Sequence, residues 1–209
     1  SCSNNGLYVA ALGYSDQSSS SFATTGVARS SGLEYCVLLR PNGTRSWGSY
    51  TIDRDQDYPS SIEVTGSGNI IVMNNKFLLE KFNLQGSKST QLNISNNNIE
   101  VYDLCTDNKG YLYAAGAIDN PTTSQLTNMK FGRNQSIYGG GSKDGFISKI
   151  KISDLSISWS TFDGGSNYDA YSTIYHNSSK LYIGGSSTSS GMTTTNAFQK
   201  NFASFKNGY

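Results

Sequence analysis

The sequence is poor in charge and in the side chains that most enzyme sites use. Charged residues make up 15% of its 209 positions, against roughly 25% in an average soluble domain. Its one histidine, His176, excludes metal sites built on two or more imidazoles. It precedes an Asn-Ser-Ser stretch, where we expect an ordinary turn residue. We therefore predict that the protein is not an enzyme, with no catalytic residue, no cofactor and no assigned metal ligand.

Clustered basic residues and long apolar runs are missing too. The net charge is +1, and Lys and Arg are scattered singly, whereas nucleic-acid binding requires a basic stripe with several phosphate contacts. Apolar runs such as 36–39 and 70–73 have the length of a strand, far below the ~20 residues that span a bilayer. We expect neither nucleic acid as a partner nor insertion into a membrane.

Cysteine is scarce as well, with only Cys2, Cys36 and Cys105. They show no CxxC motif and no metal-type spacing. Two interpretations stay open: small buried strand residues, or one disulfide with the third thiol free or paired elsewhere.

What the sequence does have is Ser, Thr, Asn, 22 Gly and 14 Tyr, a composition typical of short strands joined by tight turns. A strand-like motif occurs at 7–11, 112–116 and 181–185, with a looser copy at 70–73, and each copy follows a polar turn. Internal repetition of this kind indicates a repeat fold.

The other strand-like segments recur in the same order around these motifs. The interval from Ile52 to Val64 is 12 residues, and the same interval separates Leu92 from Leu104 and Phe162 from Ile174. Period-2 patterning and turn punctuation favour strands over helices. We predict thirteen strands: 7–11, 35–40, 46–52, 61–64, 70–73, 77–82, 89–94, 101–105, 112–116, 146–150, 156–162, 171–175 and 181–185.

Four-stranded units repeated at this spacing predict an all-β fold, a β-propeller with four-stranded antiparallel blades over a single region 1–209. The predicted boundaries are a last strand of a preceding blade plus a linker at 1–34, a blade at 35–75, a blade at 76–143 with a long linker at 117–143, and a blade plus linker at 144–209.

One stretch carries a family resemblance. Asp144-Gly145-Phe146-Ile147-Ser148-Lys149-Ile150 resembles "DAFVAKL", 160–169 resembles "STYLGGSGDD", 181–187 resembles "YVTGST" and 193–199 resembles "PTTPGAFQ". These are motifs of the bacterial-type seven-bladed β-propeller repeat family, matched best over 144–199. The resemblance implies a propeller and an extracellular or cell-surface location. It implies no single activity and no site residues.

Thirteen strands do not divide evenly into four-stranded blades. We expect a partial propeller, an excerpt whose remaining blades lie elsewhere. The alternative is a small closed ring, in which the strand near residue 7 would pair with residues near the C-terminus.

Three kinds of candidate site residue emerge. Asp53, Asp55 and Asp57 alternate as at the start of a calcium loop, but Tyr58 stands where that loop needs Gly, and turn capping by Asp side chains is the competing interpretation. Trp47 and Trp159 lie in predicted strands, where packing between blades is expected. Sequons that could carry glycans begin at Asn42, Asn93, Asn134 and Asn177.

The function expected first is a non-catalytic binding or scaffolding propeller that mediates protein–protein contacts through its loops. Its partners would be other protein chains or the remaining blades of the same propeller. The alternatives are a carbohydrate-binding or sugar-processing propeller and a structural spacer of a surface filament or adhesin.

Overall fold

The computed structural model describes residues 9–19, 23–51, 59–94 and 97–199, and these form thirteen antiparallel strands and one short helix. Every predicted strand overlaps an observed one, so the all-β class is confirmed. The strands are β1 (Val9–Ser19), β2 (Gly32–Leu39), β3 (Arg45–Tyr50), β4 (Pro59–Val64), β5 (Ile70–Asn74), β6 (Leu78–Phe82), β7 (Lys88–Asn93), β8 (Ile99–Thr106), β9 (Tyr111–Ile118), β10 (Asp144–Lys151), β11 (Ile157–Asp163), β12 (Asp169–Asn177) and β13 (Lys180–Ser187).

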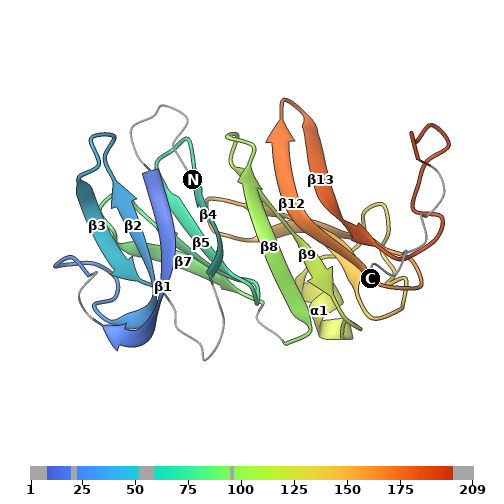
Figure 1. Ribbon diagram of the computed structural model, residues 1–209, viewed down its shortest axis with the longest axis horizontal. Coiled ribbons are helices and arrows are strands. Elements are labelled where there is room, and N and C mark those ends of the chain that lie inside the picture. The colour runs from blue at the N-terminus through green and yellow to red at the C-terminus, as the bar shows by residue number, and fades with distance from the viewer. Residues whose placement is uncertain (1–8, 20–22, 52–58, 95–96, 200–209) are drawn as a thin grey trace, which may run out of the picture.

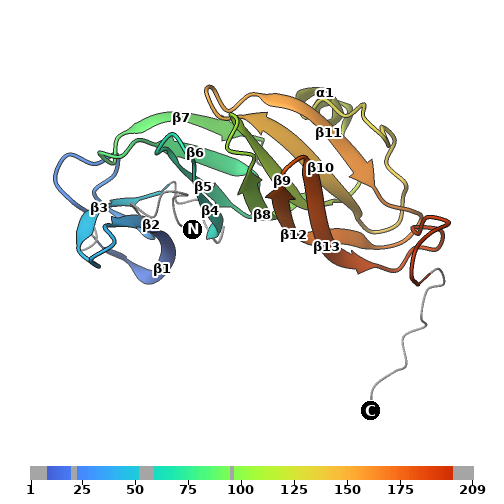
Figure 2. The same cartoon turned by 90° about the horizontal axis from the view of Figure 1, so that it is seen from above.

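The strands form four sheets, each a meander in chain order (Figure 1). The first sheet is β1-β2-β3, the second β4-β5-β6-β7, the third β8-β9-β10-β11 and the fourth β12-β13. The four sheets follow one another along a curved row (Figure 2). Strands β1 and β13 lie in different sheets, at opposite ends of that row.

The sheets are offset by two strands from the predicted blades. The unit predicted at 35–75 contributes β2 and β3 to the first sheet and β4 and β5 to the second, and the units at 76–143 and 144–209 are divided in the same way. The strand in 1–34 is not the end of a separate blade, because β1 pairs with β2. The predicted boundaries are wrong because the variable linkers, taken as separators, join neighbouring strands of one sheet.

Side chains on the two faces of the third sheet pack against two different neighbouring sheets, in keeping with the alternation of side chains along a strand. In the third sheet, Leu104 and Leu112 belong to the core shared with the second sheet. The next residues along the chain, Cys105 and Tyr113, belong to the core shared with the fourth sheet. A smaller core joins the first two sheets around Trp47.

The first strands of the sheets contact one another in order, β1 with β4, β4 with β8 and β8 with β12. Asp103 of β8 connects three of them through its carboxylate. It accepts hydrogen bonds from Ser61 of β4 at 3.3 Å and, on its other oxygen, from Thr173 and the backbone amide of Ile174 in β12 at 3.1 and 2.9 Å. One half-buried acid thus links three sheets through its hydrogen bonds.

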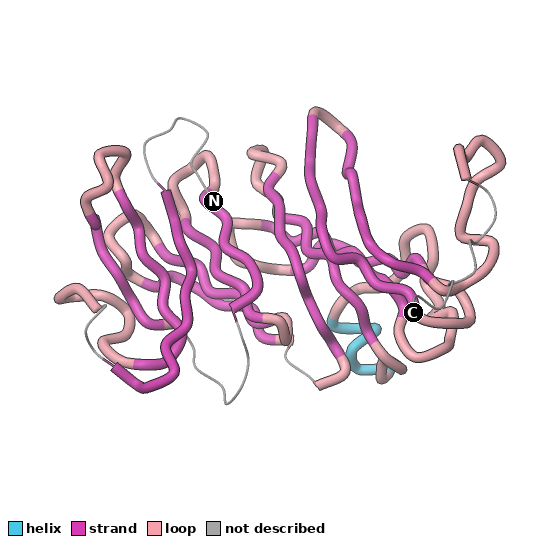
Figure 3. The backbone as a smooth tube through the Cα atoms, viewed as in Figure 1, coloured by secondary structure: helices cyan, strands magenta, loops and turns pink. Residues whose placement is uncertain are grey.

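The long segment between β9 and β10, predicted as a linker at 117–143, contains a helix, α1 (Thr123–Asn128), the lone cyan element of Figure 3. The helix begins with a capping box, in which Thr122 and Gln125 exchange side chain–backbone hydrogen bonds. Beyond it, the backbone of Phe131 and Gln135 bridges to β11. The insertion therefore covers the outer edge of the third sheet, which would otherwise be open to pairing.

Candidate functional site

The fourth sheet presents an exposed aromatic face. Tyr175 of β12 and Tyr182 of β13 are directly opposite each other in the strand register, and their ring centres lie 6.4 Å apart. The two side chains are 63% and 54% exposed. On the other face of the same ribbon, Ile174 and Leu181 pack against the third sheet. The ribbon is therefore buried on one face and open on the other.

The preceding repeat shows which element covers the corresponding face of the third sheet. Counting along the 12-residue interval, Tyr175 corresponds to Cys105, and the shared motif aligns Tyr182 with Tyr113. Cys105 and Tyr113 are each 7% exposed, because the fourth sheet lies on them. The tyrosine pair thus occupies positions that a following sheet buries in the preceding repeat.

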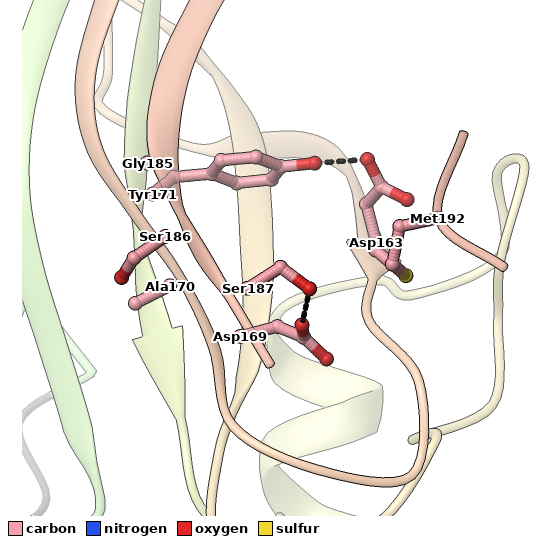
Figure 4. Close-up of a pocket in the computed structure, with 8 residues that line it drawn as sticks. All are labelled: Asp163, Asp169, Ala170, Tyr171, Gly185, Ser186, Ser187 and Met192. Carbon is pink, nitrogen blue, oxygen red and sulfur yellow. Dashed lines mark hydrogen bonds between the residues drawn. The ribbon is translucent and has the colours of Figure 1, made fainter. Parts of the chain in front are cut away.

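An acidic pocket of about 200 Å³ lies at the other end of the ribbon, between β11, β12 and β13 (Figure 4). Asp169 accepts hydrogen bonds from Ser189 at 2.8 Å, from the Gly165 amide at 2.7 Å and from Ser187. The Tyr171 hydroxyl donates a hydrogen bond to Asp163. The pKa of Tyr171 is raised, first by burial and then by this neighbouring carboxylate. Both carboxylates therefore accept hydrogen bonds from neighbouring residues of the chain, as expected of carboxylates with a structural role.

Asp144, the first residue of β10, is the buried acid behind this pocket. It is fully inaccessible, and its Oδ2 accepts a hydrogen bond from the Gly139 amide. Burial, with the charges of Asp169 and Asp163 adding to it, raises the pKa of Asp144 to about 6. The ionised form is therefore less favourable here than in water.

The raised pKa predicts a pH-dependent stability. The folded state holds the Asp144 proton more tightly than the unfolded state, so lowering the pH from 7 to 5 should stabilise the fold by about 1 kcal/mol through this group. Asp144→Asn should remove that gain, as measured by urea unfolding at both pH values. Asp154→Asn, at an exposed turn, is the matched control. An unchanged pH dependence in Asp144→Asn would refute the assignment.

The structure describes some of the predicted site residues and not others. Asp53, Asp55, Asp57 and Cys2 lie outside the described residues. Cys36 and Cys105 are buried strand residues with free thiols. Burial raises the pKa of both thiols, that of Cys105 to about 12, so neither is activated as a nucleophile.

The sequon asparagines Asn42, Asn93, Asn134 and Asn177 are all exposed, and Asn42 accepts a 2.7 Å hydrogen bond from the hydroxyl of Thr44 in its own sequon. His176 was predicted as a turn residue, which is wrong. It lies within β12 and stacks on Tyr113 at 5.8 Å, because its strand continues two residues beyond the predicted end.

Two absences apply to the described part of the chain. No three His, Cys, Asp or Glu side chains there are grouped so that they could hold a metal ion. Nor does any helix within those residues have the length and apolar character needed to cross a membrane.

Comparison with known proteins yields little. No protein-family model matches the chain, and no curated protein matches it. Among solved structures, the chain is similar to one described as KlHsv2 with loop 6CD replaced by a Gly-Ser linker, at 11% identity and a TM-score of 0.35. The match covers 78% of this chain and spans 42% of that structure.

Proposed function

We propose that the chain is part of a β-propeller of the bacterial-type seven-bladed repeat family and acts as a non-catalytic protein-binding scaffold outside the cell or at its surface. Support for the propeller comes from the two complete four-stranded meanders, the curved row of sheets and the ordered contacts between first strands. Sheets that pack face to face around an axis have this arrangement. The location depends on the sequence resemblance alone.

The observation that carries the binding role is the exposed pair Tyr175 and Tyr182 on the fourth sheet. The corresponding residues of the third sheet are covered by a neighbouring sheet. The occupant of the open face is therefore a further sheet of the same repeat type, and tyrosine is well suited to it because the ring buries a large area while the hydroxyl stays hydrated.

The edge of the same ribbon supports this occupant. Strands β5 and β9, which correspond to β13 in the repeat, pair with β6 and β10. Among the described residues, no strand pairs with the outer edge of β13. Two further strands supplied by a partner would satisfy its backbone groups by strand addition.

Self-association tests this proposal, because a second copy of the chain carries sheets of the required type. We expect concentration-dependent association in sedimentation velocity, weakened at least tenfold by the double replacement Tyr175→Ser and Tyr182→Ser. The reason is the loss of the buried aromatic area at the interface.

Ile137→Ser is the matched control, because Ile137 is 77% exposed but lies in the insertion rather than on the ribbon. Equal association of the double variant and the control would contradict the proposal. A chain that stays monomeric yet binds glycans through the same tyrosines would favour the carbohydrate-binding alternative instead.

A further inference from the structure

A pocket lined by lysines lies between the second and third sheets, at the end where the turns after β4, β8 and β10 meet. Its volume is about 330 Å³. The polar side chains of its wall belong to three lysines, two serines, an asparagine and a tyrosine, with no carboxylate among them: Lys81, Lys109, Lys151, Ser67, Ser153, Asn69 and Tyr111. The pocket belongs to a different part of the molecule from the tyrosine face and carries the opposite charge from the acidic pocket.

Lys81 is the buried member of this group, at 8% exposed. Its Nζ donates to the carbonyl oxygens of Ile152 at 3.0 Å and Ser153 at 2.6 Å. An ammonium group has three N–H donors, so these contacts leave one donor. In the described residues no carboxylate lies within ion-pair distance of it, since the two ion pairs found there are Lys88–Glu80 and Lys143–Glu100. Buried charges are normally paired, because desolvation without compensation is unfavourable.

The surroundings add further positive charge, and among the described residues none of these lysines forms an ion pair. Lys109 and Lys151 are exposed at the pocket, and the Nζ of Lys149 lies 4.0 Å from the ring centre of Tyr111, another lining residue. The acids of the same turns keep their charge but make their hydrogen bonds within the turns. Asp107 accepts the Lys109 amide at 2.7 Å, and Asp154 accepts the Ser156 amide and hydroxyl at 3.0 and 2.8 Å.

From this geometry we infer a binding site for a tetrahedral oxyanion, a sulfate or phosphate group, between the second and third sheets. Lysine binds such groups as a point charge, and three lysines around one cavity match a doubly charged anion. Hydroxyl and amide groups of Ser67, Asn69 and Ser153 lie in the same wall to hydrogen-bond its oxygens. This site is independent of the proposed scaffold role.

The test is a titration of the ¹⁵N-labelled full chain with sodium phosphate, sodium sulfate and sodium chloride at matched ionic strength. We expect saturable amide shifts at Gly110 and Ser153 with phosphate and sulfate but not with chloride. The double replacement Lys109→Gln and Lys151→Gln should weaken binding at least tenfold. Both side chains are exposed, so these changes leave the buried Lys81 contacts intact.

Lys180→Gln replaces an exposed lysine at the start of β13, away from the pocket, and as the control it should leave the affinity unchanged. A parallel titration with a phosphate monoester separates the two sources of the anion: binding of the ester assigns the group to a larger ligand, and binding of the inorganic ion alone assigns it to the free ion. Shifts that are equal in chloride, or equal affinity in the double variant, would overturn the inference.

Discussion

Replacing Trp47 by alanine is expected to lower the free energy of unfolding by about 3–5 kcal/mol, the range for large aromatic residues removed from a core. Trp47 is 3% exposed and lies in the core shared by the first two sheets. Its ring centre is 5.9 Å from that of Phe82, and its Nε1 donates to the carbonyl of Leu84 at 2.9 Å. The variant loses both the packing and the hydrogen bond that join the two sheets.

Urea unfolding followed by circular dichroism measures this loss. Trp47→Phe keeps most of the ring packing and removes the hydrogen bond, so it should cost only about 1–2 kcal/mol. Trp159→Ala supplies a second comparison, because Trp159 is only partly buried against the core shared by the third and fourth sheets. A Trp47→Ala variant no less stable than Trp159→Ala would show that this sheet junction is not anchored by Trp47.

Gly116→Ala is expected to destabilise the fold by about 3 kcal/mol, at the upper end of the range for overpacking. A Cβ at this position would lie 2.0 Å from the carbonyl oxygen of Glu100 and 2.8 Å from the Cα of Val101. The close approach arises where the pairing register of β8 shifts between Val101 and Asp103, at a β-bulge. The contacting atoms are backbone, so no side chain can move aside.

The control for Gly116 is Gly132→Ala, because a Cβ there would meet nothing within 4 Å. Its effect should stay within about 0.5 kcal/mol. Gly185 faces the same geometry as Gly116, with a Cβ placed 2.1 Å from the carbonyl oxygen of Ala170 opposite the register shift in β12. An unaffected Gly116→Ala would mean that the bulged strand yields without loss.

The existence of the strands could be predicted from the sequence, whereas their grouping into sheets could not. Period-2 patterning and the repeated turns mark each strand locally, and both signals are visible in the chain. A period has no natural starting point, so the 12-residue interval fits any division of the repeat into blades. The division is set by the pairing of strands, such as that of β5 with β6, in which Ile70 lies opposite Phe82, and no local pattern encodes it.

Three local features were not predicted, each for a different reason. The helix α1 is only six residues long, too short for an apolar stripe, yet Thr122 and Gln125 have the spacing of a capping box and were the available signal. The exposed tyrosines were also accessible in principle, because the repeat aligns them with Cys105 and Tyr113. What the sequence lacks is the information that a sheet covers one pair and leaves the other open. A lysine such as Lys81 is expected at the surface from sequence alone. In the structure it is buried and donates hydrogen bonds to carbonyl oxygens of the turn after β10.

The two-strand offset between repeat and sheet has a consequence for how such a chain can grow by gene duplication. The first two strands of a duplicated unit would complete the sheet begun by the last two strands of the unit before it. Its own last two strands would begin the next sheet. Each new copy would then be placed in register by backbone pairing with the previous copy before any new sheet was complete. If each repeat formed one whole blade, a new copy would contact the previous copy through side chains alone. The offset therefore makes every added unit interlock with the one before it.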